Sequence, residues 1–407
     1  MQPGLAAVVV RLIGVAAFAA SGVALLHSDG YAQKRLTRLR DLDPQAQTRW
    51  EVSLPIGPHA RYTILRDRIV TLSEDRTAIR FHGLDGRLLR EVPLKVQYSR
   101  IAASPRGDRL LASSSLGEDR HFESVLDADG KELWSATLNS TLSFAPSGSF
   151  LVTDFNPLAS GQSPAAFRAE TGQGAWTDAS HPVYWNAAAA ENDALAYYQR
   201  GLLQLIDLPT GALRWQKRIP ADPHHDLGRV LISLNGQTIV VQSRVDVDKE
   251  EKRLTQVYDA QGNLLWAKQG VPIPGRTNGG VVTRLSDDGG LLAVDDLQEF
   301  IILRATDGAA TARIPERTEC CVGAFTEEML AFHQGVRTRI LRLTGTGAIA
   351  DDSTLEEPVR FLYRFAAGSP GAVGTARRYV PLVIQRTGQE LTLSEIDFSI
   401  ARSPVSR

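Results

Sequence analysis

Two adjacent cysteines, Cys320 and Cys321, are the most reactive side chains of this sequence, and the chain has no other cysteine. Metal-binding cysteine pairs are spaced as in C-x-x-C, and no such spacing occurs here. Neighbouring cysteines cannot join distant segments to each other, so the bond open to them is a strained vicinal disulfide. The alternative is a pair of small buried residues that opens a strand at 320–325.

Other motifs of catalytic chemistry are incomplete. The eight histidines form no H-E-x-x-H pair, and no G-x-S-x-G turn occurs. Gly345, Gly347 and Ala350 have the spacing of a dinucleotide-binding fingerprint, but that motif needs a helix directly after it. Two aspartates and a serine follow at 351–353, so we expect a hairpin instead. We therefore predict no catalytic residue, no metal ligand and no bound cofactor.

Composition points to a globular chain without an obvious charged partner. Hydrophobic residues make up 43% of the 407 residues and charged residues 22%, which excludes a disordered chain. The formal net charge is −1, so electrostatics gives no reason to expect binding to nucleic acid.

One phrase returns along most of the chain: a β-rich run, a turn with glycine, and a tryptophan four residues later. The complete copies are Gly130 with Trp134, Gly172 with Trp176, Gly211 with Trp215, and Gly262 with Trp266. Weaker copies lack the tryptophan and have their glycines at 86, 308, 347 and 388. Successive glycines are 39 to 51 residues apart, a period typical of propeller blades.

The chemistry of the phrase suggests a role for each residue. Glycine adopts positive φ without steric cost, as a two-residue hairpin turn requires. The tryptophan begins the outer strand, where its ring can cover the seam between neighbouring blades. A second turn recurs about twenty residues later, at 104–107, 145–148, 235–236 and 286–289. We expect it to join the two innermost strands of each blade.

The two ends of the repeat region complement each other. Residues 50–54, which begin with Trp50, read as an outer strand with no blade before it. The last unit has strands at 359–364, 379–386 and 390–398 but lacks an outer strand. We predict that the N-terminal strand completes this unit and closes a single all-β propeller at 48–400. Eight four-stranded blades fit the spacing better than the alternative of seven.

At these residues the chain resembles the quinoprotein-like propeller family, whose repeats carry the phrase Asp-x-x-Thr-Gly-x-x-x-Trp. Asp207, Thr210, Gly211 and Trp215 match it fully. The Pro-x-Gly turns are similar to those of WD-repeat proteins. Some enzymes of the quinoprotein family bind pyrroloquinoline quinone with Ca²⁺ and place a vicinal disulfide against it, so the resemblance implies a quinone- or metal-dependent oxidoreductase as one alternative. We find no matching set of Ca²⁺ ligands.

The N-terminus carries an apolar run from Leu5 to Leu26. It suits either a signal peptide, cleaved before Gln33, or a retained membrane anchor. We assign 1–32 to this segment and 33–47 to a linker. We predict an extracytoplasmic, non-enzymatic propeller that binds a protein partner, with membrane contact through residues 5–26 if they are retained. Relatives include an outer-membrane assembly lipoprotein, whose lipid-bearing cysteine has no counterpart near residues 20–35.

Overall fold

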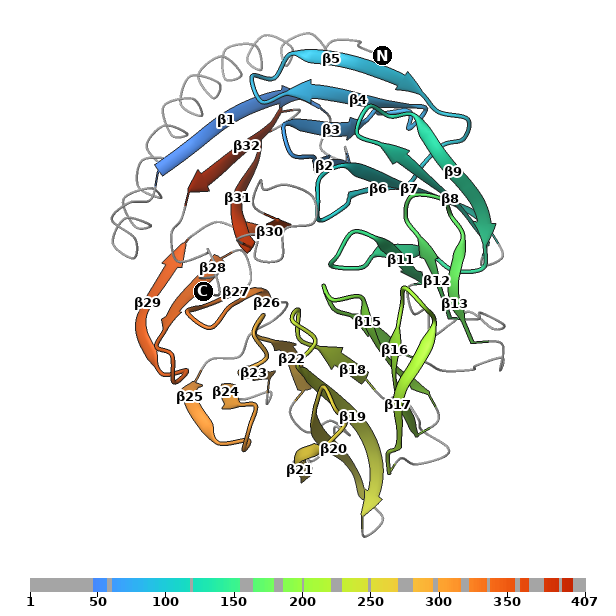
Figure 1. Ribbon diagram of the computed structural model, residues 1–407. Helices are drawn as coiled ribbons and strands as arrows, with labels where there is room; N and C mark the ends of the chain where they lie inside the picture. Colours follow the sequence, from blue (N-terminus) through green and yellow to red (C-terminus); the bar gives the residue numbers. More distant parts are fainter. Residues whose placement is uncertain are drawn as a thin grey trace, which may run out of the picture.

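The structure is a computed structural model in which every described element is a strand. It describes residues 47–56, 61–117, 120–153, 164–178, 186–199, 201–220, 229–247, 250–269, 281–295, 299–315, 322–334, 337–355, 359–365, 377–387 and 390–397. Its strands form eight four-stranded antiparallel sheets arranged around one axis (Figure 1). The prediction of an all-β propeller with eight blades is therefore confirmed. The N-terminal segment 1–46 and the pair Cys320–Cys321 lie outside the described residues.

The blades follow one another along the chain, each from its innermost to its outermost strand. Blade 1 contains β2 (Tyr62–Ile64), β3 (Arg68–Leu72), β4 (Ala78–Gly83) and β5 (Leu88–Pro93). Blade 2 contains β6 (Arg100–Ala103), β7 (Arg109–Gly117), β8 (Arg120–Asp127) and β9 (Glu132–Leu138). Blade 3 contains β10 (Leu142–Phe144), β11 (Phe150–Thr153), β12 (Ala165–Arg168) and β13 (Gly174–Thr177). Blade 4 contains β14 (Asn186–Ala189), β15 (Ala194–Gln199), β16 (Leu202–Asp207) and β17 (Ala212–Arg218).

The second half of the ring repeats this order. Blade 5 contains β18 (Arg229–Ile232), β19 (Thr238–Val247), β20 (Glu250–Asp259) and β21 (Leu264–Gln269). Blade 6 contains β22 (Val281–Leu285), β23 (Leu291–Asp295), β24 (Phe300–Arg304) and β25 (Ala310–Ile314). Blade 7 contains β26 (Val322–Phe325), β27 (Met329–Gln334), β28 (Arg337–Leu343) and β29 (Ile349–Leu355). Blade 8 contains β30 (Val359–Phe365), β31 (Arg377–Thr387), β32 (Glu390–Asp397) and, from the start of the domain, β1 (Gln47–Pro55).

Blade 8 closes the ring by joining its two ends. β1 pairs antiparallel with β32, from Gln47 opposite Asp397 to Pro55 opposite Glu390. Val52 and Leu54 of β1 are buried in one cluster with apolar side chains of β32 and blade 1. The pairing expected between the first strand and 390–398 is the one observed. Closure of this kind leaves no strand edge at the join.

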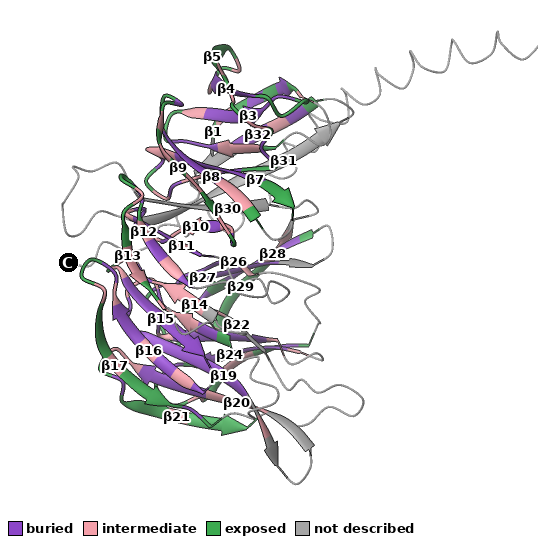
Figure 2. Cartoon of the chain, turned by 90° about the vertical axis from the view of Figure 1, so that its right-hand side faces the viewer, coloured by how far each residue is buried: buried purple, intermediate pink, exposed green. Residues whose placement is uncertain are grey.

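The hydrophobic core is divided among the seams between blades. Middle strands are buried on both faces, as in β15, where all six residues are buried. This explains why such strands read as continuous apolar runs in the sequence. Outermost strands are mostly exposed, as in β5, β17 and β21, or alternate between exposed and half-buried residues, as β9 does. Figure 2 shows this gradient from buried inner strands to exposed outer ones. From the seam between blades 8 and 1 to the seam between blades 6 and 7, each seam therefore has its own small core, built from two neighbouring sheets.

The turns before the outer strands differ from expectation in one respect. Their glycines have positive φ, 81° at Gly130 and 70° at Gly172, as predicted. The expected two-residue loop is wrong: Asp127 N donates to Lys131 O, which leaves three residues in the loop of Gly130, and Arg168 N donates to Gln173 O, which leaves four in the loop of Gly172. The Asp127 side chain explains the longer turn, since its Oδ1 accepts from the backbone N–H groups of Asp129 and Lys131, both at 2.9 Å. A three-residue loop with glycine in the left-handed region is a common hairpin form.

A register shift follows this turn in blades 1 to 7, and blade 8 has one between β32 and β1. The outermost pair of strands has one in each of the eight sheets, including the β32–β1 pair. Bulges twist an outer edge and interrupt its row of free N–H and C=O groups. The outer rim of the ring is therefore poorly suited to adding a strand from another chain.

Candidate interaction face of the ring

The repeated tryptophans lie on outermost strands and contact the next blade. Nε1 of Trp134 donates to the carbonyl oxygen of Ala169 at 2.9 Å, and Trp215 bonds Ala260 at the same distance. Trp266 bonds Ala305 at 2.7 Å. Each acceptor is the first residue of the neighbouring blade's outer turn. The indole thus ties two blades together, which is a structural role.

The repeated glycines receive these rings. A Cβ at Gly172 would lie 2.7 Å from Cδ2 of Trp134, and one at Gly262 would lie 3.0 Å from Cδ2 of Trp215. Each of these tryptophans therefore contacts the turn glycine of the following blade, although in the sequence it lies four residues after the turn glycine of its own blade. Spacing within one repeat cannot reveal this partnership, because it depends on how blades stack.

Two of the repeated tryptophans, Trp176 and Trp50, have different neighbours from the three above. Trp176 makes an edge contact with Tyr197 at a ring separation of 5.2 Å, and Gly211 of the next blade lies against the Ala175 backbone. Trp50 packs half-buried against the apolar cluster where blade 8 meets blade 1. These positions also belong to seams between blades.

A few polar groups are buried inside the blades. Glu123 is fully buried and accepts a 2.6 Å hydrogen bond from Oγ of Ser113, its neighbour on the adjacent strand. The hydroxyl of Tyr197 meets Oδ2 of Asp178 at 2.9 Å, and burial, followed by the Asp178 charge, raises the pKa of Tyr197 far above its usual range. These buried groups could not be predicted from the sequence, since Ser and Glu in a strand usually face solvent.

In blades 1 to 7, the turns that join the two innermost strands form one face, which we call the inner-turn face. It comprises residues 65–67, 104–108, 145–149, 190–193, 233–237, 286–290 and 326–328. Four of these turns were predicted from their Pro, Asn and Gly residues. The turn of blade 4 was missed because it has no glycine: Asp193 takes the positive φ, at 57°.

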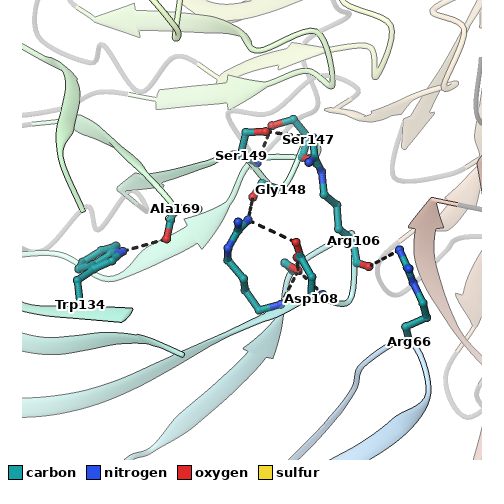
Figure 3. A network of polar contacts seen from close by, with 10 residues as sticks. Arg66, Arg106, Asp108, Trp134, Ser147, Gly148, Ser149 and Ala169 are labelled. Carbon is teal, nitrogen blue, oxygen red and sulfur yellow. Dashed lines mark hydrogen bonds and ion pairs between the residues drawn. The ribbon is translucent and has the colours of Figure 1, made fainter. Parts of the chain in front are cut away.

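Hydrogen bonds link these turns from blade to blade. Nε of Arg106 donates to Ser147 O at 2.7 Å, and a guanidinium nitrogen of Arg66 donates to Arg106 O at 3.5 Å (Figure 3). Farther around the ring, the backbone N–H of Asn235 donates to Asp287 O at 3.2 Å, and that of Asp287 donates to Phe325 O at 3.0 Å. The innermost turns are therefore held in fixed positions relative to one another.

Charge is unevenly distributed on the inner-turn face. The turns of blades 1 and 2 contain both signs of charge, Arg66 with Asp67 and Arg106 with Asp108, whereas those of blades 4, 6 and 7 contain acidic residues and no basic one within the described turns. The acidic set, which we call the acidic arc, consists of Glu191, Asp193, Asp287, Asp288, Glu327 and Glu328.

The pKa values of two members of the acidic arc are raised, mainly by burial. Burial raises the pKa of Glu327, and the charges of Asp288 and Glu328 add to the effect. Burial, with a smaller effect of the Asp207 charge, also raises the pKa of Asp193, against the opposing effects of a hydrogen bond from Ser147 and the charge of Arg106. A cation beside these carboxylates would lower both pKa values.

The described residues contain no group of three or more His, Cys, Asp and Glu side chains placed to hold a metal ion. Among the histidines, His82 is buried in blade 1 and its Nε2 lies 3.2 Å from Oγ1 of Thr71. It therefore sits in a hydrogen-bonded core position. The possible vicinal disulfide cannot be placed, since both cysteines lie outside the described part of the chain.

A closed ring of eight four-stranded antiparallel sheets, with an Asp-x-x-Thr-Gly-x-x-x-Trp turn, defines a β-propeller of the PQQ-like and WD-repeat kind. The family model described as outer membrane protein assembly factor BamB matches residues 35–312. The chain belongs to this family. No curated protein sequence matches it.

Solved structures show the same architecture at low sequence identity. BamB from Moraxella catarrhalis is 11% identical with a TM-score of 0.48, and the match covers 86% of this chain and 99% of that one. A eukaryotic initiation factor is 11% identical with a TM-score of 0.52, covering 83% and 90%. The WD40 domain of Toxoplasma gondii coronin is 10% identical with a TM-score of 0.43, covering 86% and 87%. At such identities the likeness concerns the fold alone.

Proposed function

We propose that this chain is a non-enzymatic scaffold that binds a protein partner in an extracytoplasmic compartment. The observation that carries the proposal is family membership over residues 35–312, because the family is described as an assembly factor for outer membrane proteins. The fold supports it, since a closed ring with bulged outer edges presents its turns on two faces. Rigid turns lose little conformational entropy when a partner binds.

Of the two faces, we assign the partner to the inner-turn face. Its turns are fixed by hydrogen bonds between blades, and its acidic arc favours a basic segment on the partner. The opposite face contains the turn between β3 and β4, where Glu74 is exposed.

The proposal of an extracytoplasmic compartment is based on the N-terminal segment. Residues 1–32 would direct export and, if retained, would attach the ring to a membrane through residues 5–26. A lipid on an N-terminal cysteine does not enter this proposal, because the two cysteines of the chain are Cys320 and Cys321. No helix among the described residues is long and apolar enough to span a membrane.

Site-specific photo-crosslinking in native membranes tests the proposal. A photoreactive residue at Glu328, exposed on the inner-turn face, should yield a crosslink to one protein, and adding Glu327→Lys should reduce it. The same residue at Glu74, on the opposite face, is the matched control. Equal crosslinking from both positions, or none from Glu328, would argue against the assigned face.

The alternative of a quinone- or metal-dependent oxidoreductase now rests on Cys320 and Cys321, which the structure does not describe. It stays a prediction. Reconstitution with pyrroloquinoline quinone and Ca²⁺, followed by a dye-linked oxidation assay, tests it, and turnover by the reconstituted chain would require the scaffold proposal to be abandoned.

A further inference from the structure

Exposed leucines recur at one position of the outermost strands. Among the described residues eight large apolar side chains are exposed, and seven of them are the first or second residue of an outermost strand. These seven are Leu88, Leu89, Leu133, Leu213, Leu264, Leu265 and Ile349. The eighth, Leu116, lies near the tip of the β7–β8 hairpin. Single exposed leucines are common on protein surfaces, but a position that repeats from blade to blade indicates one shared surface.

The path of the chain determines the edge of the ring at which these leucines lie. Neighbouring strands of a blade are antiparallel, so the second strand runs away from the inner-turn face and the third strand returns to it. The turn before the outermost strand, and the first residues of that strand, are therefore on the inner-turn side of the ring. The hairpin tip that carries Leu116 is on the opposite side, because it joins a second strand to a third.

Three neighbouring outermost strands, β1, β5 and β9, pack in sequence at blades 8, 1 and 2. A Cβ at Gly86, in the turn before β5, would lie 2.9 Å from Cγ2 of Val52 on β1. A Cβ at Gly130, in the turn before β9, would lie 3.0 Å from Cγ2 of Val92 on β5. The exposed leucines of β5 and β9 therefore belong to adjacent, contacting blades.

We call this surface the leucine edge and define it by Leu88, Leu89 and Leu133. Their side chains are 54%, 59% and 38% exposed. The first two are consecutive residues of one strand, so their side chains point to opposite faces of β5, and neither is covered by the ring. The leucine edge thus presents apolar surface that the folded ring leaves in water.

The chain enters the ring beside the leucine edge. β1 begins at Gln47, opposite Asp397 at the end of β32, which is the third strand of blade 8. The residues before Gln47 therefore join the ring on the inner-turn side, next to blade 1. Residues 27–46 separate β1 from the apolar run that ends at Leu26. These twenty residues span at most about 70 Å when fully extended, so an anchor at 5–26 keeps the leucine edge within reach of the bilayer.

The acidic residues near the leucine edge are paired. The outer turns and outermost strands of blades 1 and 2, at 84–93 and 128–138, contain four of them. Their ion pairs, with N–O distances from 2.7 to 3.4 Å, are Asp85 with Arg87, Glu91 with Arg80, Asp129 with Arg68, and Glu132 with Lys95. Arg90 and Lys131 add exposed positive charge in the same segments. The acidic arc lies farther around the ring, in blades 4, 6 and 7 (Figure 1).

We propose that the leucine edge rests on the surface of a lipid bilayer. This extends the proposed function, since it depends on residues 5–26 being retained as an anchor. Leucine side chains enter the boundary between head groups and acyl chains, whereas arginine and lysine keep their charges at the head groups, as Arg90 and Lys131 would do here. Contact through blades 1 and 2 leaves the acidic arc free for a protein partner.

Photo-crosslinking to lipid tests this contact on the purified full chain. The chain is reconstituted into vesicles of phosphatidylcholine and phosphatidylglycerol with a photoreactive residue at Leu89. We expect a lipid adduct, detected by mass spectrometry, at a yield severalfold above that from Leu116. Leu116 is the matched control, because it is 45% exposed and lies on the opposite face. Leu88→Gln with Leu133→Gln should lower the yield at position 89 severalfold, since transfer of each leucine out of water favours the contact.

The same vesicles separate this contact from anchoring and from partner binding. Extraction with alkaline carbonate reports whether residues 5–26 hold the chain in the bilayer, and the partner is absent, so a failed crosslink from Glu328 in native membranes would not affect the result. Whatever the extraction shows, equal lipid yields at Leu89 and Leu116, or no lipid adduct at Leu89, would overturn the proposal. So would an adduct of Leu89 with residues 5–26 or with a second copy of the chain in place of lipid.

The double variant is exposed at both positions, so its melting temperature should match that of the wild-type chain. If Leu88→Gln with Leu133→Gln does not fold, the comparison of positions 89 and 116 in the wild-type background decides the question alone.

Discussion

Replacing Gly172 by alanine tests the contact between a turn glycine and the tryptophan of the preceding blade. Gly172 has a φ of 70°, which costs a residue with a side chain about 1–2 kcal/mol. The new Cβ would also lie 2.7 Å from Cδ2 of Trp134. The ring would have to move, weakening the bond from Nε1 to Ala169 O, which contributes about 1 kcal/mol. We expect a total loss of about 2–4 kcal/mol in the free energy of unfolding.

Gly174 is the matched control, two residues farther along the same blade. It begins strand β13 without a positive φ, and a Cβ there would have no neighbour within 4 Å. Gly174→Ala should change stability by less than about 1 kcal/mol. Urea unfolding followed by far-UV circular dichroism measures both variants, and this signal does not depend on tryptophan fluorescence.

A double-mutant cycle separates the two causes. In a Trp134→Ala background the clash is absent, so Gly172→Ala should cost only the backbone share of about 1–2 kcal/mol. A stability of Gly172→Ala equal to that of Gly174→Ala would refute the reasoning. An undiminished cost in the Trp134→Ala background would show that the ring is not the obstacle.

Three further predictions concern the rest of the ring. Deleting residues 41–55 should expose strand edges and cause aggregation in size-exclusion chromatography, whereas trimming 401–407 should leave a monomer with an unchanged melting temperature. Trp215→Phe removes the hydrogen bond to Ala260 and should lower the free energy of unfolding in urea by about 0.5–1.5 kcal/mol. Trp215→Ala should lower it further, because packing is lost as well. Equal effects of the two variants would contradict this division between hydrogen bond and packing. Burial lowers the pKa of His82, so the unfolded chain takes up a proton at a higher pH than the folded chain does. The free energy of unfolding should therefore fall as the pH drops below about 6.5, by at most about 1.4 kcal/mol per pH unit. His82→Gln should flatten this dependence in unfolding curves measured between pH 5 and 8, and an unchanged slope would rule out His82 as its source.

The sequence predicts the blades well because each one is a local unit. Glycine, proline and asparagine mark its turns, and the period of the phrase around Gly211 and Trp215 counts the blades. Even the long-range closure follows, since an outer strand at Trp50 and an incomplete last unit leave one consistent solution. Features that arise between blades are harder to predict. The pairing of Trp134 with Gly172 depends on how two sheets stack.

The candidate sites were not predictable from spacing for the same reason. Asp193 and Glu327 lie far apart in the chain and belong to one arc only because their turns share a face. Glu123 reads as a solvent-facing residue until a second blade covers it.

Closure of the ring by β1 is tested most directly with a disulfide between β1 and β32. Ser53 and Thr392 lie opposite each other, and their side-chain oxygens are 2.7 Å apart, so Ser53→Cys with Thr392→Cys places two thiols in register. Under mild oxidation, peptide mapping by mass spectrometry should find an intramolecular 53–392 disulfide in a monomer. Free thiols, or disulfides that only join separate chains, would contradict closure by this strand.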